Sequence, residues 1–374
     1  MLVQIISKNN IDNLLGIDEY RKDSLVVFHS SNEKKQLNRY LEKIKEKYKN
    51  SINIIPINYS SLKDLMLEIK KLKPKYFQFN DLKIAESLAI ISGLDLEMTE
   101  IIFYNSDSMN LINYKENEIE SSKKTNEILE VSDYIQLAGG DIELDNNDAF
   151  DRLIDDGSLK MILDDFERWR RFSRAFVDPN IVDENETRPL VFTVKFKAVD
   201  RRLIKYFREY IDHFVKKDYF RVIADNMDRT IYRFTDASLK SFFKLSGSWL
   251  ELITYKAVED LKLDDIDASV LFTWDNKVKN FENEIDVLAT KNGKLIVISC
   301  KDTKKVNKEF LNEIIVNSSQ LGDDNVIKAL VTTSKLINES FFVRAKELNI
   351  AIIRYDGDFE EFKKSLRDMI LKLK

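Results

Sequence analysis

The chain has little of the residue types that mark special architectures: one cysteine, nine glycines and four prolines among 374 residues. The single cysteine, Cys300, excludes an intramolecular disulfide framework. This usage is typical of a reducing compartment, so we expect a cytoplasmic protein. Because glycine and proline are scarce, we expect long regular elements with short connections.

Histidine is also rare, with only His29 and His213 present. This scarcity argues against a metal site built from histidines and against a Ser-His-Asp hydrolase. No run of about 18 apolar residues occurs, so we expect no membrane span. No N-terminal segment has the layout of a signal peptide.

The chain lacks an excess of positive charge, since its net charge is −5. A protein that holds nucleic acid mainly by counterion release is usually basic, so a general nucleic-acid coat protein is excluded. The net charge does not exclude a local metal-dependent site or the binding of an acidic ligand by a few lysines. Hydrophobic residues make up 44% of the chain and charged residues 33%, which indicates a globular protein. Its length favours two domains.

The first ~115 residues alternate strand and helix patterns. We expect strands over 2–7, 24–31, 52–58, 76–80 and 100–107, and helices over 33–50, 60–72 and 81–93. This order predicts a parallel sheet with right-handed crossovers. Ligands of such sheets bind outside the carboxyl ends of the strands, which are small and polar here. Strand ends are polar wherever loops meet water, so this pattern alone does not decide for a nucleotide pocket.

The remaining chain divides into a polar middle and a second α/β pattern. We expect the lysine-rich residues 116–135 to leave the sheet, an acidic connector over 141–157, and one helix over 158–176. The later elements are expected as strands over 189–197, 230–235, 270–274, 326–334 and 350–355, and helices over 201–214, 247–261, 308–320, 339–348 and 359–373.

Residues 283–301, NEIDVLATKNGKLIVISCK, form the most informative stretch. Asn292-Gly293 is a strong hairpin signal. Because side chains alternate across a strand, Glu284 and Asp286 share one face of the first strand. Ser299 and Lys301 share a face of the second, and the hairpin brings Asp286 near both. Carboxylates can hold Mg²⁺ or Mn²⁺, and a lysine can orient or deprotonate water or stabilise developing charge, as phosphodiester hydrolysis requires.

The order of helix glutamate, strand aspartate and strand lysine resembles the PD-(D/E)xK nuclease superfamily. GSWLE contains the helix acid Glu251, NEIDVL contains Asp286, and ISCK ends in Lys301. Together with the N-terminal sheet, these motifs resemble the CRISPR-associated ancillary nucleases, which join a CARF domain to a PD-(D/E)xK domain. The resemblance implies an α/β protein with a Rossmann-like CARF sheet at 1–135, a helical connector at 136–188 and a restriction-endonuclease-like domain at 189–374.

The resemblance implies a metal-dependent endonuclease of type III CRISPR antiviral defence. It would be a homodimer, activated by cyclic tetra-adenylate, that cuts single-stranded RNA and DNA and nicks duplex DNA. The family's second acid stands two residues before the lysine, where this chain has Ser299. We therefore expect Glu251, Glu284 and Asp286 to hold the divalent metal, Mn or Mg. Lys301 would act on the water or phosphate, and Ser299 would assist.

The CARF resemblance also implies residues for the cyclic oligoadenylate. Asn80 and Lys83, with Asp81 between them, follow the fourth strand, although the family's glycines are missing there. The polar end of the second strand adds Ser30 and Ser31, and the first loop adds Asn9 and Asn10. Helix amides after Asn80 favour a phosphate.

Two other functions stay open from the sequence. In one, Ser299 marks a decayed site, and the chain is a cyclic-nucleotide sensor that binds nucleic acid or a partner without cutting. In the other, the chain is a restriction-type or repair-type nuclease with no second messenger. We expect Trp249, which lies in GSWLE, to pack in the core rather than to stack on a base. We expect Cys300 to lie in the core as well.

Overall fold

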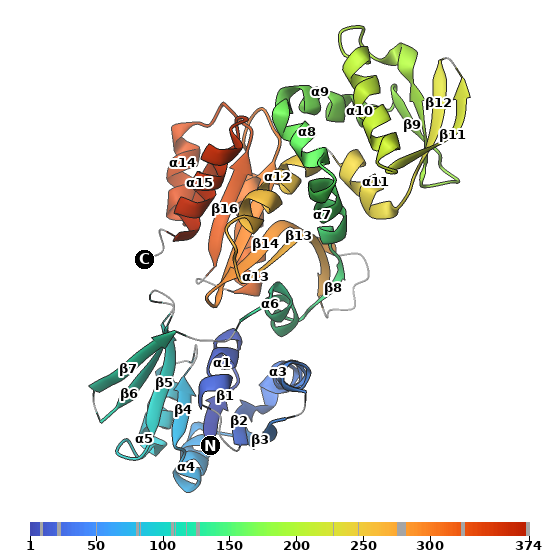
Figure 1. The fold of residues 1–374 in the computed structure, drawn as a ribbon. Coiled ribbons are helices and arrows are strands. Elements are labelled where there is room, and N and C mark those ends of the chain that lie inside the picture. The colour runs from blue at the N-terminus through green and yellow to red at the C-terminus, as the bar shows by residue number, and fades with distance from the viewer. Residues whose placement is uncertain are drawn as a thin grey trace.

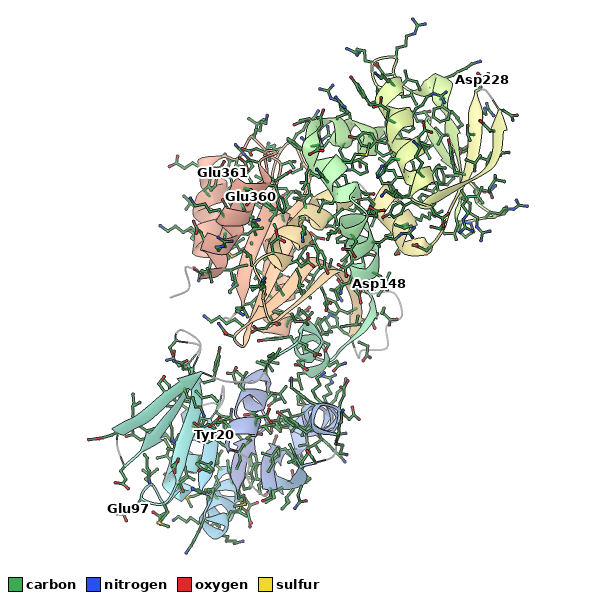
Figure 2. The ribbon with its side chains drawn as sticks, viewed as in Figure 1. Tyr20, Glu97, Asp148, Asp228, Glu360 and Glu361 are labelled. Carbon is green, nitrogen blue, oxygen red and sulfur yellow. The ribbon has the colours of Figure 1, made fainter. Side chains whose placement is uncertain are left out.

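The structure is a computed structural model, and it describes residues 1–7, 10–20, 24–49, 51–79, 82, 84–105, 108, 110–116, 118–124, 128–226, 228–245, 247–274, 282–322 and 326–371. Three sheets follow one another through the molecule (Figure 1). Glu97, near the N-terminal sheet, and Asp228, at the tip of the four-stranded sheet, lie at opposite ends (Figure 2). In the described part of the chain, no helix combines the length and apolarity that crossing a membrane requires.

The N-terminal sheet has seven strands in the order β3-β2-β1-β4-β5-β6-β7. They are β1 (Leu2–Ile5), β2 (Ser24–Ser30), β3 (Asn53–Tyr59), β4 (Tyr76–Phe79), β5 (Glu100–Asn105), β6 (Asn110–Lys115) and β7 (Glu118–Lys124). The first five pair in parallel, as the alternating pattern predicts. The helices of this unit are α1 (Ile11–Leu15), α2 (Ile17–Tyr20), α3 (Lys34–Tyr48), α4 (Leu62–Leu72) and α5 (Ile84–Gly93), with the short η1 (Ser31–Glu33).

We expected residues 116–135 to leave the sheet, but residues 118–124 form its last strand, β7. This strand turns back at Glu116, whose φ is 49°, and pairs antiparallel with β6. The polar composition that suggested a loop belongs instead to an edge strand, where lysines discourage pairing with other chains. The chain then leaves through α6 (Val131–Ala138).

A six-stranded sheet in the order β17-β16-β15-β14-β13-β8 forms the C-terminal unit. Its strands are β8 (Gly140–Leu144), β13 (Asp265–Trp274), β14 (Glu282–Lys291), β15 (Lys294–Lys301), β16 (Ile327–Thr332) and β17 (Ile350–Arg354). Residues 140–144, which we expected in the connector, pair with β13 as an edge strand. The helices of this unit are α12 (Ser248–Glu259), α13 (Lys308–Leu321), α14 (Glu339–Glu347) and α15 (Phe359–Leu371).

The chain between β8 and β13 contains a four-stranded antiparallel sheet that the sequence showed only in part, and this sheet lies at the end of the molecule away from the N-terminal sheet (Figure 1). It contains β9 (Val182–Glu184), β10 (Val191–Lys195), β11 (Phe220–Asn226) and β12 (Arg229–Phe234). The same part of the chain forms η2 (Phe196–Ala198), α7 (Asn147–Asp155), α8 (Ser158–Asp164), α9 (Phe166–Phe176), α10 (Ile204–Lys216) and α11 (Ala237–Lys244), of which α7 lies beside α12 and β13. Aromatic rings fill its core, as in the contact of Phe192 with Phe234, whose ring centroids lie 4.5 Å apart. The helix expected over 158–176 is two helices, because Asp165 ends α8 and caps α9 by accepting the Arg168 N–H.

The turn of the β14–β15 hairpin lies against the N-terminal unit. Asn292 and Gly293 have φ values of 48° and 75°, the left-handed conformation that the Asn-Gly pair predicts. The Tyr104 hydroxyl, at the carboxyl end of β5, donates to the Asn292 carbonyl at 2.6 Å, and the Tyr134 hydroxyl of α6 donates to the Gly293 carbonyl at 2.7 Å. We call this contact the tyrosine clasp.

A continuous apolar cluster surrounds the tyrosine clasp. It contains Leu2 and Ile102 of the N-terminal sheet together with Ile285 and Leu295 of the hairpin. The N-terminal sheet is thus packed directly against one end of the hairpin that contains the predicted residues Asp286 and Lys301.

Candidate active site

The open end of the β14–β15 hairpin gathers the predicted catalytic residues. The antiparallel register sets Val287 opposite Ile298, and one step further Asp286 lies opposite Ser299. The Ser299 hydroxyl donates to Asp286 Oδ2 at 3.1 Å, so these two side chains share a face as strand alternation predicts. The first turn of α12 brings Glu251 to the same region.

Asp286 is held from three directions at one oxygen. Its Oδ2 accepts the Cys300 backbone N–H at 2.5 Å as well as the Ser299 hydroxyl, and Lys301 Nζ lies 3.7 Å away. Burial raises the pKa of Asp286, although Lys301 and the two hydrogen bonds act to lower it. The carboxyl is therefore fixed in place by its neighbours but carries an incompletely compensated charge.

Glu251 is the most deeply buried acid of the group, with 9% of its surface exposed. The Ser269 hydroxyl donates to Glu251 Oε2 at 2.7 Å. Burial and, next, the charge of Asp286 raise the pKa of Glu251 to about 8. The two carboxyls are thus close enough for their charges to repel each other.

Ser269 is a site residue that the sequence analysis missed. It lies in β13, is buried, and has a φ of 48°, a left-handed conformation that is rare for serine. Ala268 packs in the cluster around α12 whereas Val270 packs in the cluster of the N-terminal unit, so the strand changes face at Ser269. Nothing in the sequence DASVL announces this bend, whose strain is typical of functional sites.

Glu284 lies beside these residues with an exposed side chain. Desolvation of its inner part and the charge of Asp286 raise its pKa, an effect that the surrounding water screens. It is therefore the solvent-facing acid of the three.

Lys301 ends β15 between two acids, with Nζ 3.7 Å from Asp286 and 3.3 Å from Glu313 of α13. Burial acts to lower the pKa of Lys301, but Asp286 and Glu313 together outweigh it and the pKa is raised. The lysine is therefore a cation at neutral pH, suited to hold a phosphate oxygen or an attacking water rather than to remove a proton unaided.

The donor set suits a hard divalent cation in part. Glu251, Glu284 and Asp286 lie around the Lys301 ammonium, and burial is the largest cause of the raised pKa of each carboxyl. Within the described residues, no three His, Cys, Asp or Glu side chains are gathered tightly enough to hold a metal ion. Mg²⁺ usually retains several waters and takes only one or two protein carboxylates, so Asp286 and Glu251 would be sufficient.

Two neighbours of the site belong to the core, as predicted. Trp249 is buried against Tyr355, with ring centroids 6.3 Å apart. Cys300 is buried on the face opposite Lys301, and its Sγ lies 3.4 Å from Thr254 Oγ1. Burial raises the pKa of the Cys300 thiol, so this thiol is not a nucleophile.

The two histidines take no part in this site. His213 Nε2 lies 2.9 Å from Ser158 Oγ, but Ser158 is completely buried, so this pair packs α8 against α10. His29 Nδ1 lies 3.0 Å from the Ser30 carbonyl.

The residues predicted for the cyclic nucleotide are placed only in part. Asn9, Asn80, Asp81 and Lys83 lie outside the described residues. Asn10 is buried, and its side chain accepts the Ser7 N–H and donates to the Ser7 carbonyl, both at 2.9 Å. The backbone of Ser7 thus occupies both polar atoms of this amide.

The two serines at the end of β2 differ from each other. Ser30 donates to Glu33 at 2.8 Å in a capping box, whereas Ser31 is exposed and reaches Asn58 at 3.4 Å. Of the described residues that we predicted, Ser31 is the one open to a ligand at this edge.

Comparison with known proteins agrees with this geometry. Residues 240–373 match the family model of the Card1-like endonuclease domain. The C-terminal part of the chain is thus similar to Card1-like endonuclease domains. Residues 189–239, which we placed in the nuclease domain, lie outside the match. No curated protein matches the chain in sequence.

Two solved structures share the fold over nearly the whole chain. One is Can2 from Sulfobacillus thermosulfidooxidans in complex with cyclic tetra-adenylate, at 14% identity and a TM-score of 0.62, covering 99% of this chain and 96% of that one. The other is VC1899 from Vibrio cholerae, at 15% identity and a TM-score of 0.72, covering 100% and 97%. The predicted fold class and the resemblance to CRISPR-associated CARF nucleases are confirmed.

The buried Glu251 predicts a pH dependence of stability. Its pKa is raised from 4.5 to about 8 on folding, so between these values the folded state retains a proton that the unfolded state has released. The free energy of unfolding contributed by this group therefore falls as pH rises through that window. The Glu251→Gln variant has no carboxyl at this position, so its stability does not fall in this way. In EDTA at pH 8.5 we expect its free energy of unfolding to exceed that of the natural chain by about 1–3 kcal/mol. At pH 4.5 the two should be nearly equal.

Urea unfolding at both pH values measures the difference. Glu259→Gln is the matched control, because Glu259 lies on the same helix with its side chain 41% exposed. Parallel stability profiles for the natural chain and Glu251→Gln would show that Glu251 is not held at a raised pKa.

Proposed function

We propose that the chain is a metal-dependent endonuclease, activated by cyclic tetra-adenylate, that cuts single-stranded RNA and DNA and nicks duplex DNA. The observation that supports this most is the convergence of Glu251, Asp286 and Lys301 at one end of the β14–β15 hairpin, inside a Card1-like endonuclease domain.

In this proposal each side chain has a separate task. Asp286 and Glu251 would hold the cation, with Glu284 at the solvent side. A bound Mg²⁺ or Mn²⁺ would activate water and offset charge on the phosphate. Lys301 would bind a phosphate oxygen or orient the attacking water. Ser299 donates to Asp286, so its task would be to orient that acid and not to replace the missing carboxylate.

The nuclease proposal predicts distinct outcomes for the site variants. Asp286→Asn and Lys301→Met should each reduce cleavage of labelled RNA and of plasmid by about 100-fold or more in Mn²⁺. Glu284→Gln should reduce it less, because this acid is exposed. Binding of cyclic tetra-adenylate should be retained in all three.

The same assay separates the alternatives. Intact nucleotide binding with no cleavage by the natural chain, under any cation, favours the decayed sensor that Ser299 suggests. Cleavage that cyclic oligoadenylates do not change favours a nuclease without a second messenger. Full activity of the Asp286→Asn variant would show that cleavage does not take place at the proposed site.

The tyrosine clasp offers a route from the N-terminal sheet to the site. Can2 shares this fold and is bound to cyclic tetra-adenylate in its structure, and we propose that the same ligand binds the carboxyl edge of β1–β5 here. Tyr104 lies at that edge and contacts the Asn292 carbonyl. The hairpin then runs from Asn292 to Asp286 and Lys301, so a shift of its turn would move both.

The clasp proposal predicts that Tyr104→Phe combined with Tyr134→Phe weakens activation. We expect the ratio of cleavage with and without cyclic tetra-adenylate to fall about fivefold or more, which corresponds to about 1 kcal/mol of lost coupling. Tyr40→Phe is the control, because Tyr40 donates to Gln4 within the N-terminal unit. An unchanged ratio in the double variant, or an equal loss in Tyr40→Phe, would contradict the route.

A homodimer through the N-terminal unit is supported by an exposed apolar face. On α5, Ile84, Leu88 and Ile91 lie one helical turn apart and expose 80%, 60% and 42% of their surface. Such a stripe on a surface helix normally covers a partner. We propose a second copy of this chain as the partner that covers the stripe. A two-fold symmetric dimer would give a cyclic ligand the same contacts from each protomer.

The dimer proposal predicts that Leu88→Glu with Ile91→Glu yields monomers in sedimentation velocity experiments. Val316→Glu on α13 is the control, since Val316 is also exposed (53%) but lies on the C-terminal unit. A dimer that survives the double substitution, or dissociates equally in the control, would exclude this face as the interface.

A further inference from the structure

The loops that follow β15 and β16 are joined into one structure beside the candidate site. Residues 302–307 and 333–338 continue the pairing of the two parallel strands beyond the sheet. Thr333 Oγ1 lies 2.6 Å from Asp302 Oδ1, Ser334 Oγ donates to the Lys304 carbonyl at 2.9 Å, and Lys305 forms a bridge with Leu336. We call this structure the paired loops.

The paired loops carry a local excess of positive charge on an acidic protein. Residues 302–307 read DTKKVN, with two lysines and one acid, and Lys335 adds a cation from the second loop. The one acid, Asp302, is buried with 2% of its side chain exposed. It is neutralised from α9, where Arg170 Nη2 lies 2.5 Å and Arg174 Nη2 lies 3.7 Å from its carboxylate.

The lysines of the paired loops are free to meet a ligand. Lys304, Lys305 and Lys335 are exposed, and their ammonium groups form no ion pair or hydrogen bond with the described part of the chain. Arg174 adds a half-exposed guanidinium beside them, with 47% of its side chain exposed. Leu336, 72% exposed, lies among these cations.

The paired loops begin at the candidate catalytic lysine. Lys301 is the residue before Asp302, and its carbonyl accepts the Thr332 hydroxyl at 2.9 Å. The row of cations therefore extends outward from Lys301 without interruption by an exposed acid within the loop 302–307. A negatively charged polymer bound there would lie on the loops that directly follow Lys301 and Thr332 in the chain.

We propose that the paired loops are the binding surface for the phosphate backbone of the nucleic acid that the site cuts. This inference rests on the proposed function and adds the residues that hold the substrate. Lysine ammonium groups on loops contact phosphates without reading base edges, so the surface gives affinity and register with little sequence preference. Arg170 is a positioning residue, because it holds Asp302 and with it the start of the loop.

A nucleic acid fits this surface better than an anionic membrane. The cations lie on two joined loops, whereas a membrane would need a broad, flat area. Leu336 adds apolar area that a base can cover and that a lipid could also cover, so the experiment includes both ligands.

The test is equilibrium binding in EDTA, where cleavage does not interfere. Fluorescence anisotropy of labelled single-stranded RNA and DNA is measured against NaCl concentration for the natural chain and for the K304Q/K305Q/K335Q variant. We expect affinity to fall about tenfold or more at low salt. The slope of log affinity against log salt should decrease by about 2, at about 0.7 for each lost phosphate contact.

A matched control removes the same charge elsewhere. Lys216, Lys346 and Lys364 are exposed on α10, α14 and α15, and the K216Q/K346Q/K364Q variant should bind like the natural chain. Equal weakening in both variants overturns the inference, because the effect would then come from net charge alone. Binding by K304Q/K305Q/K335Q that equals that of the natural chain also overturns it.

The outcomes separate this inference from the proposed function. Loss of oligonucleotide binding in K304Q/K305Q/K335Q, with no cleavage by the natural chain, supports the surface and removes the nuclease. Normal binding and cleavage by that variant removes the surface and leaves the nuclease. Loss of binding to phosphatidylserine vesicles but not to oligonucleotides overturns the assignment to nucleic acid.

Discussion

The paired strands of the β14–β15 hairpin are the constraint on which the functional part of the molecule depends. The left-handed backbone at Asn292 and Gly293 closes the hairpin and fixes its register. That register sets Asp286 opposite Ser299 and brings Lys301 to the same end. A slip by one residue would turn Asp286 to the opposite face of the sheet, because side chains alternate with a period of two. The turn and the site are therefore determined together.

The balance of charge at the site explains why so many groups surround two carboxyls. Asp286 is fixed by a backbone amide, a hydroxyl and an ammonium, and Glu251 by the Ser269 hydroxyl. Burying ionised carboxyls is unfavourable, so these contacts offset only part of the desolvation. The desolvation that these contacts do not offset raises the pKa of both carboxyls, and a bound divalent cation would lower these pKa values again. Nearby, the buried Asp302 carboxylate is paired with two arginines of α9, Arg170 and Arg174.

The parts of the fold that the sequence predicted well have strong periodicity. The parallel strands β1–β5 and the elements from α12 to α15 follow apolar patterns that tertiary contacts do not override. Polar edge strands were missed: β7 and β8 resemble loops because their outer sides face water. The four-stranded sheet was seen only in part, since β9 is three residues long and β11 is mostly exposed.

The same distinction holds for the site. Asp286, Ser299 and Lys301 were predictable as neighbours because one hairpin contains them all. Ser269 was not, because its role arises from a left-handed bend that no local motif encodes. Asn10 was predicted for a ligand but is bonded to the backbone of Ser7, a contact that depends on how the loop folds. The direction of Glu284 toward solvent likewise follows from the packing around it.

The tyrosine clasp has a consequence for the order in which the chain acquires its contacts. Glu251, Ser269, Asp286 and Lys301 come from one short stretch of sequence, whereas Tyr104 and Asn292 are 188 residues apart. Closing a longer loop loses more chain entropy, and this difference grows slowly with length. Contacts with large sequence separation also slow folding. The candidate site is thus a local structure, whereas its connection to the N-terminal sheet joins residues separated by about half of the chain.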